Sequence, residues 1–365
     1  MAAPTGSVSD PLATAVSQRS ATVVVSDGFV VTIEVDPGWE AKGLTVTTDG
    51  SGASPIESAG VLAGDRPDNK FGTLHSAFSP EPVVVFAPKG LTVSDPVVVI
   101  NHHSTASSVS FSHLVVVADE ASDVAVVEYQ SSGDELSVSV PLVSLHTAQA
   151  ARLNYVVIQE HGQQHWQIGQ QVSYVDAQAT LTSGLAAFGG TYARTRTDSR
   201  LVGRGSTANL IAAYYGDGDQ TLDFRTFQHH EARDTKSDLL FKGSLDDQSG
   251  SIYTGLINIH PEGAGTNAFQ TNRNVKLSDD AWAWSVPNLE INNNDVHCSH
   301  ASTVSPIDEE QRFYLHARGV PPIVADRLVV AGFYQEVLDR LPVPGAANEV
   351  RRLITSKLDR RSANV

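Results

Sequence analysis

The chain has 365 residues, of which 41% are hydrophobic and 18% are charged, and its formal net charge is −16. This composition is typical of a globular protein with a hydrophobic core, and the excess of carboxylates argues against binding to nucleic acid or to an anionic membrane surface. One cysteine excludes an internal disulfide, no apolar run reaches the roughly 20 residues of a membrane span, and residues 1–20 lack the features of a secretory signal, so we expect a cytoplasmic protein.

Residues 1–80 are predicted to form a partly disordered N-terminal region. Residues 1–20 are small and polar, a composition typical of disorder. The β-branched runs ATVVVS and FVVTIEV are separated by Asp27-Gly28, which predicts a β-hairpin. Residues 48–80 are rich in Gly, Ser, Asp and Pro and predict a loop with one short helix near residues 69–77.

Short β-branched segments then follow one another from residue 82 to residue 300, at intervals of roughly 10–15 residues. Examples are PVVVF, VVVI, HLVVVA, RLNYVVIQ and SIYTGLINI. No helical period interrupts them, which argues against a fold in which helices alternate with strands. The residues alone leave a sandwich or barrel and a β-solenoid as alternatives, and no strict repeat decides between them.

The cysteine of this chain, Cys298, lies next to His297 and two positions before His300. In a strand, Cys298 and His300 point to one face and His297 to the other. A thiolate and an imidazole on one face suit iron or zinc, but a cluster or a closed zinc site takes about four ligands. A metal site here therefore needs ligands from another polypeptide. The alternative is that Cys298 is a buried apolar side chain and that the histidines bind no metal.

Helices are predicted for residues 305–365. Ser305 is a candidate N-cap with Pro306 at the first helical position, and acidic residues follow in the first turn. Apolar stripes predict a second helix over residues 323–341 and a third over residues 347–360. These helices would cap the exposed end of a solenoid or present a docking surface.

The run CSHASTVSPIDEEQRFYLHARGV resembles the signature of the SufB/SufD family, the scaffold proteins of Fe–S cluster assembly. The positions that fit the family pattern are Cys298, Ser299, His300, Thr303, Val304, Phe313, Tyr314, Leu315, Arg318 and Gly319. Departures at Ala301, Ser302, Ser305 and Ala317 are all to small residues. The Cys-Ser-His form is similar to the SufD branch, because the SufB branch tends to carry Glu-His-Glu there. Upstream, Gln270, Asn272 and Asn274 resemble a family Gln-x-Asn-x-Asn pattern, for which we expect a structural role as an amide ladder between coils.

The resemblance implies a mainly β protein with a right-handed parallel β-helix over residues 81–304 and a small C-terminal helical domain over residues 305–365. It implies a non-catalytic scaffold subunit of the SUF system. Cys298 and His300 would bind metal as this chain's ligands to a transient Fe–S cluster shared with a SufB-type partner. The C-terminal helices would bind the SufC-type ABC ATPase. Some complexes of this kind bind a flavin, and no motif in this sequence supports that cofactor.

Other motifs in the sequence offer little chemistry. The chain has no phosphate-binding loop and no GxSxG, HExxH or CxxC motif, so we expect no enzymatic activity. His102-His103 and His229-His230 are poor chelates because neighbouring side chains of a strand face opposite ways. One alternative is a polysaccharide-active β-helix enzyme, with candidate carboxylates Asp217, Asp219, Asp223, Asp246 and Asp247. Another is a structural β-solenoid without a site.

Overall fold

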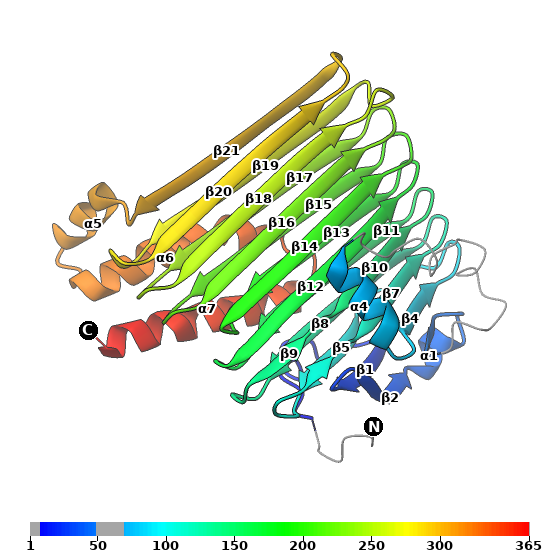
Figure 1. The fold of residues 1–365 in the computed structure, drawn as a ribbon, viewed down its shortest axis with the longest axis horizontal. Coiled ribbons are helices and arrows are strands. Elements are labelled where there is room, and N and C mark those ends of the chain that lie inside the picture. Colours follow the sequence, from blue (N-terminus) through cyan, green and yellow to red (C-terminus); the bar gives the residue numbers. More distant parts are fainter. Residues whose placement is uncertain (1–7, 49–68, 365) are drawn as a thin grey trace.

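The β-branched segments form strands of two facing sheets, and the chain passes from one sheet to the other to form a β-solenoid of about 8 turns (Figure 1). The computed structural model describes residues 8–48 and 69–364. Sheet A contains β1 (Ala21–Ser26), β2 (Phe29–Val35), β5 (Val97–His103), β8 (Asp123–Ser132), β11 (Arg152–Glu160), β13 (Thr180–Ala187), β15 (Thr207–Gly216), β17 (Lys236–Leu245), β19 (Thr266–Lys276) and β21 (Val296–Pro306). Sheet B contains β3 (Thr45–Thr47), β4 (Val83–Ala87), β6 (Val109–Ser110), β7 (His113–Ala118), β9 (Ser137–Ser139), β10 (Leu142–Thr147), β12 (His165–Val175), β14 (Tyr192–Leu201), β16 (Thr221–His230), β18 (Gly250–Ile259) and β20 (Trp282–Ile291).

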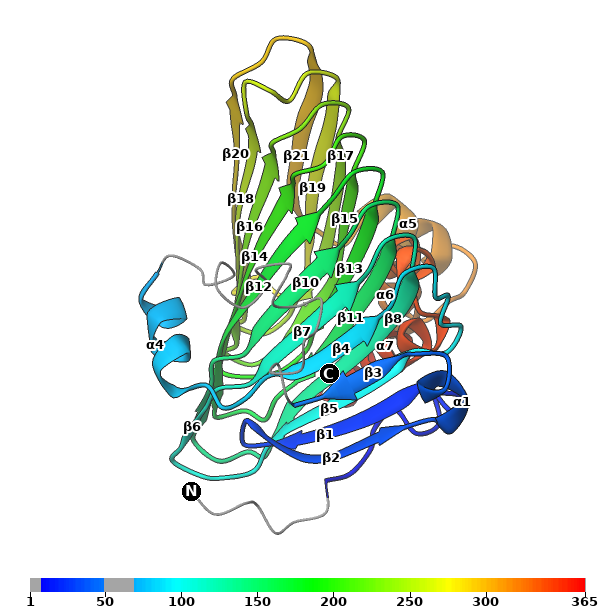
Figure 2. The same ribbon diagram turned by 90° about the vertical axis from the view of Figure 1, so that its right-hand side faces the viewer.

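Successive coils stack on one another along the solenoid (Figure 2). Their strands pair in parallel and in register, so equivalent side chains lie above one another. The core between the sheets is apolar through most of its length, with Val126, Leu153, Leu181, Leu210 and Phe224 among its buried members. The structure thus decides for the solenoid over the sandwich or barrel.

The turns that lead from sheet B to sheet A repeat one backbone device. Each contains a residue with positive φ, whose N–H donates to the carbonyl of the corresponding turn in the next coil. These residues are Ala121, Ala150, Gln178, Gly205, Asp234 and Gly265. A small side chain follows each of them and is fully buried: Ser122, Ala151, Ala179, Ser206, Thr235 and Thr266. The backbone conformation and the side-chain size repeat, whereas the residue type does not.

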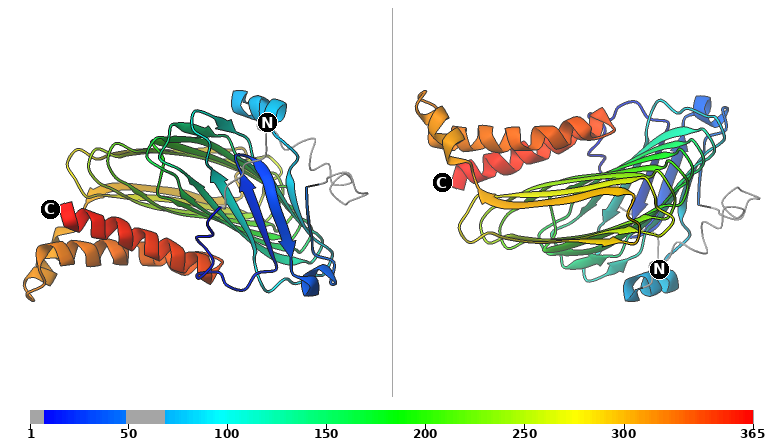
Figure 3. Two further views of the ribbon diagram at one scale, coloured as in Figure 1. Left: turned by 90° about the horizontal axis from the view of Figure 1, so that it is seen from below. Right: turned by 90° about the horizontal axis from the view of Figure 1, so that it is seen from above.

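The C-terminal helices are α5 (Glu309–His316), α6 (Pro322–Arg340) and α7 (Pro344–Asn364). Helices α6 and α7 lie side by side on the outer face of sheet A (Figure 3), where they bury a second apolar core against β11, β15 and β17. The expectation that the helices cap the end of the solenoid is therefore wrong. Outward residues of sheet A such as Ile158, Ile211 and Leu240 are apolar, and this is the surface that the helices cover.

The helical segment begins later than predicted. Strand β21 pairs with β19 as far as Pro306, so no helix begins at Pro306 and Ser305 is not an N-cap. Asp308 is the N-cap of α5, and its side chain accepts a hydrogen bond from the backbone N–H of Gln311 at 3.0 Å. Among the described helices, none is long and apolar enough to cross a membrane.

The N-terminal region is more ordered than its composition predicts. The Asp27-Gly28 hairpin is confirmed, because β1 and β2 are antiparallel neighbours and β1 joins the solenoid through β5. A short helix α1 (Pro37–Glu40) follows, and α4 (Lys70–Phe78), capped by Asn69, confirms the helix expected near residue 70. Leu12 and Val16 are buried in the core beneath α6 and α7, so the expectation of disorder is wrong for residues 8–20. Residues 1–7 and 49–68 lie outside the described part.

Candidate functional site

The coil formed by β20 and β21 ends the solenoid. Strand β21 pairs with β19 along one edge and strand β20 pairs with β18, and the other edge of each strand has no partner among the described residues. Since α6 and α7 lie on the outer face of sheet A, no described element covers this last coil (Figures 1 and 2). The last coil therefore presents two open backbone edges and its own inward-facing side chains.

Cys298 and His300 both belong to the inward-facing set of β21. In the register of the sheet, Cys298 lies next to Ala268 and His300 next to Gln270, and both of these β19 residues are buried in the interior. His297 alternates to the opposite face. The structure thus brings Cys298 and His300 to one face of the terminal strand.

The environments of the two side chains differ. Cys298 is half-buried and packs against a small apolar cluster of Ile257, Ile259 and Ala268, whereas His300 is exposed. Burial raises the pKa of the Cys298 thiol, although the backbone N–H of Ala268 partly offsets this effect. A metal that binds here must therefore displace a proton from a thiol that is largely protonated at neutral pH.

The donor set of this site is incomplete. A thiolate and an imidazole are suitable ligands for iron, but they fill two of about four positions. Nowhere in residues 8–48 and 69–364 do three or more His, Cys, Asp or Glu side chains form a group that would hold a metal ion. A cluster bound by Cys298 and His300 would need its remaining ligands from outside the described chain.

The expected amide ladder has a different geometry. Gln270, Asn272 and Asn274 are inward-facing residues of one strand, β19, and do not stack from coil to coil. Asn274 donates to Asn272 Oδ1 at 2.9 Å, and both side chains bond the hydroxyl of Tyr214, at 3.0 Å from Asn272 Nδ2 and 2.7 Å from Asn274 Oδ1. Tyr214 comes from β15 and reaches past Gly243 of β17, because these residues share a column with Asn274. The two asparagines form part of a buried polar layer just inside the last coils.

Apolar side chains are exposed around the last coil. The exposed fraction is 64% for Trp284 and 51% for Val286, both on the outer face of β20. The remaining members of this set point inward at the open end: Leu289, Ile291 and Val304. Exposed apolar side chains beside open strand edges are typical of a protein–protein contact.

A second exposed apolar surface lies on the C-terminal helices. Phe313 and Tyr314 of α5 are 75% and 56% exposed, and Leu328 of α6 is 51% exposed. The guanidinium of Arg318 lies 3.5 Å from the centre of the Tyr314 ring. This surface lies on the helices and is separate from the inward-facing side chains of β21.

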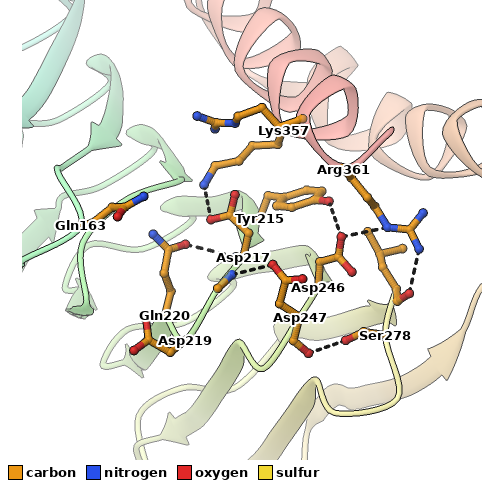
Figure 4. A pocket seen from close by; sticks show the side chains of 13 residues that line it. Gln163, Tyr215, Asp217, Asp219, Gln220, Asp246, Asp247, Ser278, Lys357 and Arg361 are labelled. Atoms are coloured by element: carbon orange, nitrogen blue, oxygen red, sulfur yellow. Dashed lines mark hydrogen bonds and ion pairs between the residues drawn. The ribbon is translucent and has the colours of Figure 1, made fainter. Parts of the chain in front are cut away.

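Four of the five candidate carboxylates gather at a pocket between the solenoid turns and α7 (Figure 4). These are Asp217, Asp219, Asp246 and Asp247, while Asp223 lies apart on sheet B. Lys357 and Arg361 of α7 form ion pairs with Asp217 at 2.6 Å and with Asp246 at 2.8 Å. These ion pairs attach α7 to the solenoid and neutralise two of the four carboxylates of the pocket.

The tandem histidines face opposite ways, as predicted. His103 and His230 point into the interior, where serine and threonine hydroxyls and a backbone carbonyl bond their ring nitrogens. Two further interior histidines, His161 and His165, stack with 4.1 Å between ring centres. Sequence reasoning missed this buried group, and the inward alternation of His165 and Gln167 along β12 was the available signal.

The comparisons with known proteins agree on one family. The model described as "SUF system FeS cluster assembly, SufBD core domain" matches residues 99–333. An iron-sulfur cluster assembly SufBD family protein of Mycobacterium tuberculosis is 32% identical over 283 residues, which are 75% of this chain and 68% of the relative. The iron-sulfur cluster assembly protein SufD of Bacillus subtilis is 28% identical over 302 residues, 80% of this chain and 67% of the relative. For SufD of Escherichia coli the identity is 31% over 180 residues, 49% of this chain and 43% of the relative.

Proposed function

Because this chain belongs to the SufBD family of the SUF iron-sulfur cluster assembly system, we propose that it is a SufD-like scaffold subunit. A nascent Fe–S cluster forms at its interface with a SufB-type paralogue and is cargo that leaves again. Cys298 and His300 are this chain's ligands, and the chain itself catalyses no reaction. The observation that carries the proposal is the position of both side chains on the last strand of an uncovered coil.

The incompleteness of the donor set supports a shared site. Two ligands hold iron weakly, so a cluster stays bound only while a second protein supplies the remaining ligands. Separation of the two subunits then removes half of the coordination sphere. An incomplete site at a subunit interface therefore suits a protein that builds clusters and passes them on.

A paralogue with a similar solenoid is the partner that fits the open end. The unpaired edges of β20 and β21 can extend into strands of a second solenoid, and burial of the apolar set around Trp284 would contribute to association. Such an end-to-end contact would bring ligands of the partner close to Cys298. The same contact would exclude water from a thiolate-bound cluster.

The surface on α5 is suited to the second partner. Phe313, Tyr314 and Leu328 are exposed on α5 and α6, which follow β21 and are not part of its open strand edge. An ABC ATPase of the SufC type could bind there without blocking the contact between the two solenoids. In this proposal the assembly acts in the cytoplasm, where thiolates remain reduced.

The site is tested by replacing Cys298 and His300 singly with Ala in a strain that depends on this system for its Fe–S clusters. His297→Ala is the matched control, because His297 is an exposed histidine of the same strand that points to the other face. We expect loss of cluster delivery for both site variants and normal delivery for the control. Normal delivery in both site variants would refute the assignment.

The two partner surfaces are tested separately by co-purification. Trp284→Asp should weaken recovery of the SufB-type partner and leave recovery of the ABC ATPase unchanged. Phe313→Asp should have the reverse effect. If each variant lost both partners or neither partner, the assignment of two distinct surfaces would be wrong.

A further inference from the structure

Gln270 of β19 carries a buried side-chain amide without a partner. The residue is 2% exposed, and neither its Nε2 nor its Oε1 makes a hydrogen bond. The neighbouring inward residues Asn272 and Asn274, by contrast, bond each other and Tyr214. Since an unpaired buried amide is unfavourable, its position beneath the last coil calls for an explanation.

The side chain of Gln270 lies across the interior. On the opposite sheet, a Cβ atom at Gly255 would come closer than 3.0 Å to the Gln270 amide, so this glycine makes room for it. The amide therefore lies against the backbone of β18. Above it in the stack are Pro287, in register with Gly255, and His300, in register with Gln270.

His300 is the in-register neighbour of Gln270 in the last coil, and its imidazole offers a polar group. Adjacent strands are about 4.8 Å apart, so in-register side chains of β19 and β21 are within reach of each other. The imidazole of His300 is exposed and can turn over the amide below it. A neutral imidazole that binds a metal through one nitrogen carries a hydrogen on the other, and that N–H needs an acceptor.

We propose that Gln270 is a positioning residue for His300: Gln270 Oε1 accepts the ring N–H of His300 and so directs the other ring nitrogen towards the metal shared with Cys298. This inference rests on the proposed function, because it assigns a role to His300 as a ligand. It gives the buried amide a hydrogen-bond partner. Carbonyl groups that accept from metal-bound histidines fix the tautomer and the orientation of the ring.

The experiment measures Co²⁺ binding to the full-length chain by titration of the absorption that Co²⁺ gains from thiolate and imidazole ligands. Gln270→Leu should weaken binding roughly 10–100-fold, as removal of such an outer partner typically does. Gln270→Glu keeps an acceptor at the same place and should restore most of the affinity. In a His300→Ala background, Gln270→Leu should have no further effect.

Gln228→Leu is the matched control. Gln228 of β16 is fully buried with both amide atoms unpartnered, and Ile257 separates it from the last coil. Thermal unfolding of both leucine variants shows whether they fold, and we expect melting temperatures at or above that of the parent chain, since an unpaired amide is removed. Equal effects of the two leucine substitutions on Co²⁺ affinity would overturn the inference and indicate that both amides bind buried water.

The outcomes also separate this inference from the proposed function. If Cys298→Ala and His300→Ala leave Co²⁺ binding unchanged, the proposed site is wrong and this inference falls with it. If both variants lose the absorption while Gln270→Leu retains parental affinity, the site stands and the role of Gln270 is refuted.

Discussion

Gly243→Ala tests whether stability depends on the packing of the Tyr214 side chain, which extends from β15 past Gly243 of β17 to β19. Tyr214 is fully buried, and its ring occupies the space beside the Cα of Gly243, where an added Cβ would lie closer than 3.0 Å. The alanine therefore forces the ring out of its place. The movement also removes the tyrosine hydroxyl from Asn272 and Asn274, which are both buried.

The magnitude combines two effects. Overpacking in a dense core costs about 1–3 kcal/mol. Loss of the hydroxyl leaves buried amide groups unsatisfied, at about 1–3 kcal/mol. Since the side chains can relax together, we expect the free energy of unfolding to fall by about 2–5 kcal/mol. Tyr214→Phe removes the hydroxyl alone and should account for about 1–3 kcal/mol of this loss.

The measurement is urea unfolding at neutral pH. The midpoint of each variant and the slope of its free energy against urea concentration give its free energy of unfolding. Gly332→Ala is the control: Gly332 lies in α6 with open space around its Cα, so the same substitution there should stabilise by about 0.5–1 kcal/mol. In a Tyr214→Leu background, Gly243→Ala should cost less than in the parent. A stability of Gly243→Ala within about 0.5 kcal/mol of the parent, or costs that simply add in the double variant, would refute this reasoning.

Burial lowers the pKa of interior histidines from 6.5 to about 3 for His161, about 2 for His165 and about 3 for His230. Below pH 6.5 the unfolded chain therefore binds more protons than the folded chain. The free energy of unfolding should be highest above pH 6.5 and should decrease as the pH falls towards 3, with a slope that approaches ~1.4 kcal/mol per pH unit for each histidine. Urea unfolding at about pH 7.5, 6 and 5 measures this slope, and a flat profile would contradict it. Tyr334→Phe removes the 2.5 Å hydrogen bond from the Tyr334 hydroxyl of α6 to the carbonyl of Tyr214. The free energy of unfolding measured with urea should fall by about 1 kcal/mol. An unchanged midpoint would show that this bond contributes nothing. Cys298→Ala and His300→Ala should each change the free energy of unfolding by less than about 1 kcal/mol, because both positions lie on a strand with one open edge. A larger loss would mean that an effect of these variants on cluster delivery reflects impaired folding.

Local signals in the sequence predicted much of the secondary structure. The Asp27-Gly28 hairpin, the helix near residue 70 and the two long C-terminal helices all follow from turn chemistry or apolar periodicity within a few residues. The predicted start of the first C-terminal helix was wrong, because Ser305 and Pro306 are acceptable both at a helix start and at the end of an edge strand. Pairing with β19 decided between these possibilities, and such pairing is not a local property.

The repeat between coils could not be recognised in the sequence, because the coils share backbone conformation and side-chain size at equivalent positions but not residue type. The left-handed turn position is filled by Ala, Gln, Gly or Asp in different coils, so no repeated letter marks it. The position of the helices was equally hidden. An apolar stripe on α6 requires a partner surface, but it does not say whether that surface is the end or the outer face of a solenoid.

The sequence by itself determined that the chain is built of strands followed by helices, and the motif around Cys298 indicated its family, because alternation, turn residues and short motifs act over a few neighbouring positions. The tertiary structure alone decided that the last coil is uncovered, that Gln270 lies unpaired beneath His300, and that Tyr214 reaches Asn274 past Gly243. These features depend on the register between strands about 30 residues apart in the chain. That register is set by the packing of all coils together, and no single segment encodes it.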